Sequence, residues 1–153
     1  MAVEVGQDAP DFTLRDENGE EVALSSLRGR NVVLIFFPAA FSGLCTKELH
    51  TATDLAETYG AAGAEVFGVS VDSPYALKAF KRDEGLEARF LSDFHPKGQV
   101  AEEYDAYIPE AGVATRATYV IDKDGKVAYK MVNHPGEMRD QDAIIEALAA
   151  CPI

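Results

Sequence analysis

The sequence is short of the features that define several large classes of protein. Its 153 residues include only two cysteines, Cys45 and Cys151, which are too few for a disulfide scaffold and too far apart for a Cys-x-x-Cys redox or zinc motif. No apolar run approaches the roughly 18 residues that a membrane crossing needs. The N-terminus also lacks the basic start and apolar stretch of a secretory signal. We therefore expect a cytoplasmic protein without a membrane partner.

Positive charge is equally scarce. The chain has 14 lysines and arginines against 26 aspartates and glutamates, a formal net charge of -12, and its longest basic run is Lys81-Arg82. Such a surface repels phosphate backbones, so we expect no nucleic-acid partner. The three histidines share no metal-ligand spacing, and no glycine-rich phosphate loop follows a predicted strand. We expect neither a metal nor a cofactor, and interpret the histidines as solvated surface residues.

What the sequence does contain is an alternation of strand and helix patterns. Apolar blocks at 32–37 and 64–71 are typical of strands buried on both faces, and helical spacing follows from 43 to about 61 and again from Pro74. The remaining predicted elements are an N-terminal hairpin around Asn18-Gly19, a strand at 89–91, a short helix at 100–104, a hairpin at 117–132 and a helix at 141–150. This order predicts one α/β domain over residues 1–153, with a thioredoxin-like fold and an N-terminal β-hairpin extension.

One cysteine lies where a buried strand gives way to a helix. Cys45 is placed in the first turn, on the inward face marked by Leu49 and Ala52. Unpaired backbone N–H groups and the positive end of the helix dipole favour an anionic sulfur there. A free cysteine in an apolar first turn is also often just a small buried hydrophobic residue. Position alone does not decide between a reactive thiolate and a packing residue.

The residues around Cys45 resemble a known active-site signature. The pattern Pro38-x-x-x-Ser42-x-x-Cys45-x-x-Glu48 is similar to that of peroxiredoxins, in which Thr or Ser occupies the Ser42 position. Arg116, just before a predicted strand, resembles the active-site arginine of the same family. The opening segment at 5–14 is also similar, so the resemblance covers nearly the whole chain. The segments at 36–45, 91–96 and 135–141 most resemble the alkyl hydroperoxide reductase E subfamily.

The resemblance implies a role for each signature residue. Cys45 is expected to attack a hydroperoxide, Ser42 to hydrogen-bond the sulfur and the peroxide oxygen, and Pro38 to shield the thiolate from water. Arg116 is expected to supply positive charge, and Glu48 to orient arginine. Plainer interpretations stand beside these: Ser42 as a helix cap, Pro38 as a strand terminator and Glu48 as an exposed helix carboxylate.

The subfamily resemblance also implies a one-cysteine mechanism and a homodimer. A sulfenic acid on Cys45 would be reduced by an external thiol, either a mycoredoxin-, thioredoxin- or glutaredoxin-like protein or a low-molecular-weight thiol. His50 stands five residues after Cys45, where another branch has its second cysteine. Cys151 is only superficially similar to the resolving cysteine of the typical two-cysteine branch, because no longer tail follows it. The departures from the subfamily are His95, in place of a larger aromatic, and the extra Cys151. Arg139 could lie near the site or the dimer interface, but we favour the interpretation of a solvated arginine at a helix start.

The predicted function is thus an antioxidant, thiol-dependent peroxidase acting on hydrogen peroxide, organic hydroperoxides or peroxynitrite. Two alternatives stay open. A thioredoxin-like thiol–disulfide oxidoreductase would need a cysteine at Ser42 and a proline near Ala117, and the sequence has neither. A peroxide-sensing interaction protein would use oxidation of Cys45 as a switch, without turnover.

Overall fold

The computed structural model describes residues 3–134 and 137–151, with only the backbone of Leu44. The strands are β1 (Thr13–Asp16), β2 (Glu21–Ala23), β3 (Asn31–Phe36), β4 (Ala64–Ser70), β5 (Arg89–Ser92), β6 (Tyr107–Ile108), β7 (Val113–Ala114), β8 (Arg116–Ile121) and β9 (Val127–Asn133). Seven of them form one sheet in the order β2-β1-β5-β4-β3-β8-β9, and β6 pairs with β7 apart from it. Strands β3, β4 and β5 are parallel, whereas the other pairings are antiparallel.

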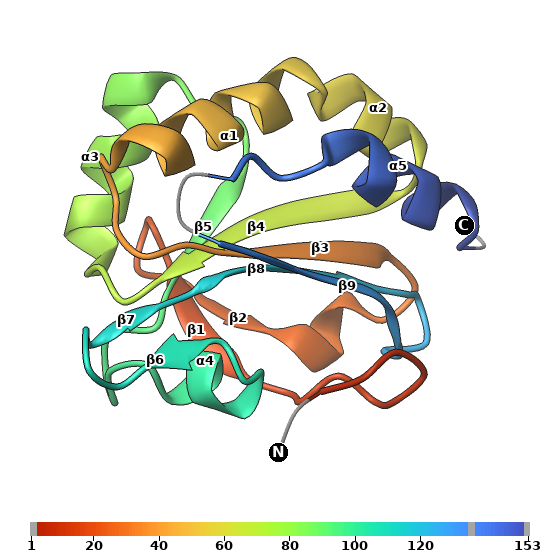
Figure 1. Cartoon of the computed structure of the whole chain (residues 1–153), viewed down its shortest axis with the longest axis horizontal. Helices are drawn as coiled ribbons and strands as arrows, with labels where there is room; N and C mark the ends of the chain where they lie inside the picture. Colours follow the sequence, from red (N-terminus) through yellow and green to blue (C-terminus); the bar gives the residue numbers. More distant parts are fainter. Residues whose placement is uncertain (1–2, 135–136, 152–153) are drawn as a thin grey trace.

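Helices cover both faces of the sheet (Figure 1). On one face lie α1 (Gly43–Asp54), α2 (Ala56–Ala61), α3 (Pro74–Glu84) and α5 (Gln141–Ala149), and on the other lie α4 (Gln99–Glu103) and a 3-10 turn at Leu24–Leu27. None of the helices in the described ranges has the length and apolar character needed to cross a bilayer.

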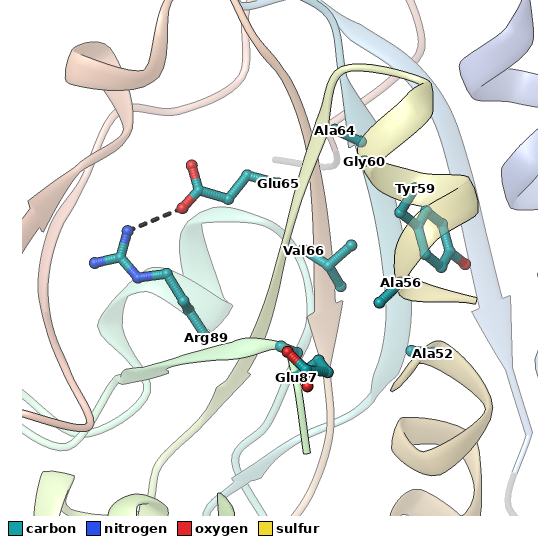
Figure 2. A pocket seen from close by; sticks show the side chains of 10 residues that line it. Ala52, Ala56, Tyr59, Gly60, Ala64, Glu65, Val66, Glu87 and Arg89 are labelled. Atoms are coloured by element: carbon teal, nitrogen blue, oxygen red, sulfur yellow. Dashed lines mark hydrogen bonds and ion pairs between the residues drawn. The ribbon is translucent and has the colours of Figure 1, made fainter. Parts of the chain in front are cut away.

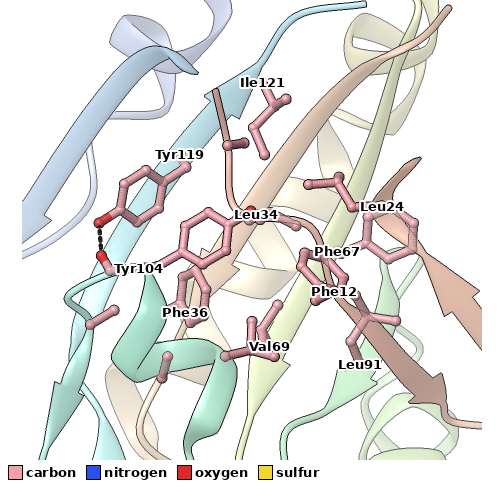
Figure 3. Close-up of a cluster of buried hydrophobic side chains, with 14 of the residues drawn as sticks. Phe12, Leu24, Leu34, Phe36, Phe67, Val69, Leu91, Tyr104, Tyr119 and Ile121 are labelled. Atoms are coloured by element: carbon pink, nitrogen blue, oxygen red, sulfur yellow. Dashed lines mark hydrogen bonds between the residues drawn. The ribbon is translucent and has the colours of Figure 1, made fainter. Parts of the chain in front are cut away.

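The sheet is buried on both faces because successive side chains of a strand point in opposite directions. In β3, Val32, Leu34 and Phe36 belong to the core beneath the sheet, which includes α4 and the N-terminal hairpin. Figure 3 shows this core, where the Tyr119 hydroxyl donates to the backbone carbonyl of Tyr104. The intervening β3 side chains enter the second core, under α1, α2, α3 and α5. The predicted strand buried on both faces is therefore confirmed.

One predicted element is interrupted. The single helix expected from 43 to about 61 is broken at Leu55, whose φ and ψ are -98 and 12 degrees. In the turn before the break, the hydroxyls of Thr51 and Thr53 donate to the carbonyls of Lys47 and Leu49. Such bonds from a threonine to the fourth preceding carbonyl bend helices. The 3-10 turn, β6 and β7 were not predicted, because elements of two to four residues carry no measurable periodicity.

Candidate active site

Cys45 lies at the carboxyl end of the central parallel strands. Strand β3 ends at Phe36, and α1 begins at Gly43 after Ser42, which has the extended backbone of an N-cap residue. Cys45 is in the first turn on the inward face, as predicted, and is only 4% exposed. Neither described cysteine forms a disulfide. The carboxyl ends of parallel strands are where α/β proteins commonly bind ligands.

A short loop, residues 37–42, joins the strand to the Cys45 helix, and we call it the Cys45 loop. Phe41 within it has a φ of 66 degrees, a left-handed conformation that costs a non-glycine residue on the order of 1–3 kcal/mol. The exposed Phe41 ring contacts Phe80 edge-on, with 5.0 Å between ring centroids. The Ser42 hydroxyl donates to the Ala39 carbonyl at 2.8 Å and makes no bond that caps the helix. Ser42 is therefore an N-cap by backbone position alone, and Pro38 lies half-buried at the start of the loop.

Glu48 lies one helical turn after Cys45 and is 2% exposed, so the exposed-carboxylate interpretation is wrong. Its Oε1 accepts hydrogen bonds from Nη2 of Arg116 at 2.7 Å and from Nε of Arg139 at 3.2 Å. Its Oε2 accepts from the backbone N–H of Arg139 at 2.6 Å. The carboxylate thus accepts hydrogen bonds from two guanidinium groups.

Arg116 is the first residue of β8 and is 5% exposed. Besides the bond to Glu48, its Nη1 donates to the carbonyl of His134 at 2.6 Å. Its Nε is buried and has no hydrogen-bond partner in the described part of the chain. The guanidinium is therefore fixed by two acceptors, while its buried Nε–H is left without one.

The interpretation of Arg139 as a solvated arginine is wrong. Its side chain is fully buried, and it donates to the Phe36 carbonyl at 2.6 Å, to the Ala117 carbonyl at 2.9 Å and to the Thr118 hydroxyl at 2.8 Å. The segment before α5 crosses the ends of β3 and β8, where these acceptors need a donor. Burial lowers the pKa of Arg139, and Glu48 opposes that shift. The signal in the sequence was Glu48 itself, because a carboxylate near the inward face of a helix needs cationic partners. Pro135 and Gly136, in the same resembling segment, lie outside the described residues.

The charges of this cluster do not cancel. Glu48 contributes one negative charge, and Arg116 and Arg139 contribute two positive charges. The three buried side chains thus carry a formal balance of one positive charge, and electrostatic interactions are stronger among buried groups than in bulk solvent. The cluster therefore favours an anion at this end of the sheet.

No histidine side chain in the described residues hydrogen-bonds to this cluster, and His134 contacts it through its backbone carbonyl alone. His95 and His134 are exposed, as predicted. His50 is half-buried, and its Nε2 lies 2.9 Å from the carboxylate Oε1 of Glu84, so it is paired and not simply solvated.

Cys151 is remote from Cys45. It follows α5, is 8% exposed, and its thiol donates to the Ala147 carbonyl at 3.4 Å. Burial, with a smaller contribution from Asp122, raises the pKa of this thiol. Asp122 follows the last residue of β8, whereas Arg116 begins that strand beside the Cys45 helix. Six strand residues span roughly 15–20 Å, well beyond the ~7 Å between α-carbons that a disulfide allows.

A hollow lies at the amino ends of the parallel strands, opposite the Cys45 site (Figure 2). It is lined by Ala52, Ala56, Tyr59, Gly60, Ala64, Glu65, Val66, Glu87, Ala88 and Arg89. At its margin, Nη1 of Arg89 lies 2.9 Å from the carboxylate of Glu65. Ala64 and Arg89 begin β4 and β5, whereas Cys45 follows the carboxyl end of β3. This hollow is therefore separate from the Cys45 site.

The family model described as AhpC/TSA family matches residues 5–130, a span that holds Cys45, Glu48 and Arg116. The chain belongs to the AhpC/TSA family. Among its relatives, this AhpC/TSA protein is 40% identical over 147 residues to alkyl hydroperoxide reductase E of Mycobacterium tuberculosis, covering 95% of this chain and 96% of that one. It is 41% identical over 128 residues to the chloroplastic peroxiredoxin Q of Oryza sativa subsp. japonica, covering 83% and 58% of the two chains.

Solved structures agree with this assignment. The crystal structure of peroxidoxin BcpB from Mycobacterium tuberculosis is similar with a TM-score of 0.86 at 30% identity, over 97% of both chains. That of AhpC from Enterococcus faecalis is similar with a TM-score of 0.88 at 25% identity, over 98% of this chain and 92% of the other. The AhpC/TSA protein is therefore a peroxiredoxin, and the predicted thioredoxin-like fold of the peroxiredoxin type is confirmed.

Proposed function

We propose that this peroxiredoxin is a thiol-dependent peroxidase in which Cys45 is the nucleophile. The observation that carries the proposal is the cluster of Glu48, Arg116 and Arg139, which places a net positive charge beside the helix start that holds Cys45. Relatives of this chain are named alkyl hydroperoxide reductase and peroxiredoxin, which agrees with a peroxidase function. The comparisons do not favour the redox-switch or thiol–disulfide alternatives.

The first step oxidises Cys45 by two electrons. The thiolate attacks one oxygen of the hydroperoxide, an S–O bond forms, and the O–O bond breaks. The other oxygen leaves as an alkoxide or hydroxide and takes up a proton, so the products are a sulfenic acid and an alcohol or water. In this step negative charge moves from the sulfur to the leaving oxygen.

Ionisation of the thiol explains only a small part of the expected acceleration. A free thiol with a pKa of about 8.5 is already roughly 3% ionised at pH 7, so complete ionisation raises the rate at most about 30-fold. The greater part must come from donors aimed at the charge that develops on the peroxide oxygens. We assign this role to the first N–H groups of α1, to the unpartnered Nε of Arg116, and to the Ser42 hydroxyl, which must turn from the Ala39 carbonyl to donate to peroxide. Pro38, half-buried before them, would limit access of water.

We propose that an external thiol resolves the sulfenic acid. The separation of Cys45 from Cys151 supports this, because the second thiol of the chain is buried at the far end of β8. One thiol condenses with the sulfenic acid to form a mixed disulfide and water, and a second thiol releases Cys45. Candidate reductants are mycoredoxin-, thioredoxin- or glutaredoxin-like proteins and low-molecular-weight thiols. Both cysteines are free, which suits a reducing compartment such as the cytoplasm.

We also propose a homodimer. Exposed apolar side chains follow three neighbouring parallel strands: Phe41 after β3, Tyr75 after β4 and Phe94 after β5. Exposed apolar side chains gathered at the carboxyl ends of neighbouring strands are typical of an interaction surface. Sedimentation of the wild type and of Tyr75→Glu tests this, since a charge at an 87% exposed tyrosine should weaken association without unfolding the chain.

The deciding experiment is peroxide consumption with saturating thiol, beside an insulin-reduction assay. We expect the wild type to consume peroxide and to leave insulin disulfides intact. Reduction of insulin without consumption of peroxide would assign the chain to the thiol–disulfide oxidoreductases. Stoichiometric oxidation of Cys45 without turnover would support the redox-switch function.

A further inference from the structure

Asp72 lies beside the Cys45 loop, because the strands that precede the two segments are neighbours in the sheet. Strands β3 and β4 are parallel, with Phe36 opposite Val69, and the backbone N–H of Phe37 continues the pairing by donating to the Val69 carbonyl at 3.0 Å. The segments that follow the two strands are therefore neighbours. Asp72 belongs to the short connection between β4 and α3, which runs beside residues 37–42.

The Asp72 carboxylate reaches across to that loop. Its Oδ2 accepts a hydrogen bond from the backbone N–H of Ala40 at 2.8 Å and another from the Ser70 hydroxyl at 2.6 Å. The Asp72 carbonyl accepts from the Ser92 hydroxyl at 2.6 Å. Both serines are buried at the carboxyl ends of β4 and β5. Asp72 is thus held by two strands that do not carry Cys45, and offers a fixed acceptor to the loop that leads to it.

The loop needs such an anchor. Phe41, next to Ala40, has the left-handed backbone described above, and conformations of this kind persist only where the surroundings determine them. In the described part of the chain, no side chain from outside the loop other than Asp72 hydrogen-bonds to residues 38–41. A hydrogen bond from an N–H to a carboxylate is stronger than one to a neutral acceptor. Loss of this bond would let the backbone around Phe41 relax and would displace Ser42.

We propose that Asp72 is a positioning residue for the peroxide reaction, holding the Cys45 loop so that the Ser42 hydroxyl and the start of α1 face the sulfur. The inference rests on the proposed peroxidase function of Cys45. An electrostatic role and a positioning role for Asp72 predict opposite effects of removing its carboxylate. If the negative charge of Asp72 mattered most, its removal would favour the Cys45 thiolate and speed its reactions. If position matters most, removal slows attack on peroxide, which needs aligned donors, but not alkylation, which needs only a thiolate.

The test compares Asp72→Ala and Asp72→Asn with the wild type. For each folded variant, the rate constant for peroxide is measured by competition with a second peroxidase, and the rate constant for iodoacetamide is measured at the same pH. We expect Asp72→Ala to slow the peroxide reaction by roughly tenfold or more, with alkylation changed by less than about threefold. Asp72→Asn should recover most of the peroxide rate, because its amide oxygen can still accept from Ala40 and Ser70.

A matched control comes from the far end of the sheet. Asp122 is also half-buried, and its Oδ1 accepts from the backbone N–H groups of Asp124 and Lys126. Asp122→Ala should leave both rate constants unchanged. If Asp72→Ala does not fold, Ser70→Ala takes its place, since it removes the hydroxyl that orients the carboxylate, and we expect a slower peroxide reaction with unchanged alkylation.

Two results would overturn the role of Asp72. One is a peroxide rate equal to that of the wild type in Asp72→Ala or, where that variant does not fold, in Ser70→Ala. The other is a parallel loss of peroxide and alkylation rates, which would indicate general disruption. A wild type that alkylates readily but never reduces peroxide would instead overturn the proposed function of Cys45.

Discussion

Glu48 and Arg139 are joined twice, through different carboxylate oxygens: the backbone N–H of Arg139 donates to Oε2 at 2.6 Å, and its Nε donates to Oε1 at 3.2 Å. This double contact ties α1 to the segment before α5, 91 residues apart in the chain. Because Oε1 also accepts from Arg116, the same carboxylate connects the helix that holds Cys45 to β8. A change at any of the three residues is therefore expected to affect both stability and reactivity.

Arg139→Met should be strongly destabilising. It removes the hydrogen bonds to the Phe36 and Ala117 carbonyls and one of the two cations around a buried carboxylate, a change that typically costs about 3–5 kcal/mol. Urea unfolding measures the loss. The control is Arg82→Met, which removes an exposed arginine paired with Asp83 and should change stability by less than about 0.5 kcal/mol. Equal effects of the two substitutions would show that the buried cluster contributes nothing specific.

Arg116→Ala should slow the attack on peroxide even when every thiol is ionised. At a pH well above the ordinary range of a thiol, the remaining loss reports stabilisation of the transition state, and we expect about 2–4 kcal/mol, as for one lost oxyanion donor. The chain has no tryptophan, so a competition assay must report the rate. A folded variant that equals the wild type at high pH would limit Arg116 to promoting ionisation. Equality at every pH would leave it a structural residue.

Cys45→Ser should abolish peroxide reduction while the protein stays folded, since the exchange is nearly isosteric and the arginine cluster is untouched.

Cys151→Ser should retain turnover with an external thiol, because Cys151 lies beyond the opposite end of β8. Mass spectrometry after one equivalent of peroxide should find a trapped sulfenic acid on Cys45. Turnover by folded Cys45→Ser, or a dominant disulfide between the two cysteines, would contradict the one-cysteine mechanism.

Asp16 should make stability fall in acid. Burial alone would raise its pKa, but hydrogen bonds from Arg89 and from the backbone N–H groups of Glu20 and Asn18 outweigh burial, and its pKa is lowered. A carboxyl with a lowered pKa in the folded state stabilises the protein above its ordinary pKa of about 3.9, and this contribution is lost as pH falls through the folded value. Asp16→Asn should be less stable than the wild type at pH 7, with a difference that shrinks toward pH 2. A constant difference across this range, measured by urea unfolding, would contradict the assignment.

The sequence predicted the parts of the site that depend on local pattern. The apolar block of β3 and the helical spacing after Gly43 placed Cys45 correctly in the first turn of α1. Asp72 could not be placed in this way, because it acts through contacts with a loop and strands distant in sequence and lies in no pattern that distinguishes it from a surface residue. Arg139 lies in a segment that resembles the subfamily, but its pairing with Glu48, 91 residues away, does not follow from local pattern. The break of the helix at Leu55 was not predicted either, because the apolar face of the helix continues across it to the buried Tyr59.

The position of Cys151 beyond the far end of β8 also has a kinetic consequence. With no second thiol of the same chain in reach, the oxidised intermediate leaves by two competing bimolecular routes, one first order in reductant and the other first order in a further molecule of peroxide. The fraction of protein inactivated per cycle is then set by the ratio of those two concentrations, weighted by their rate constants. Gradual inactivation would therefore record the balance of oxidant and thiol around the protein, and adding reductant at fixed peroxide should lengthen its working life in proportion.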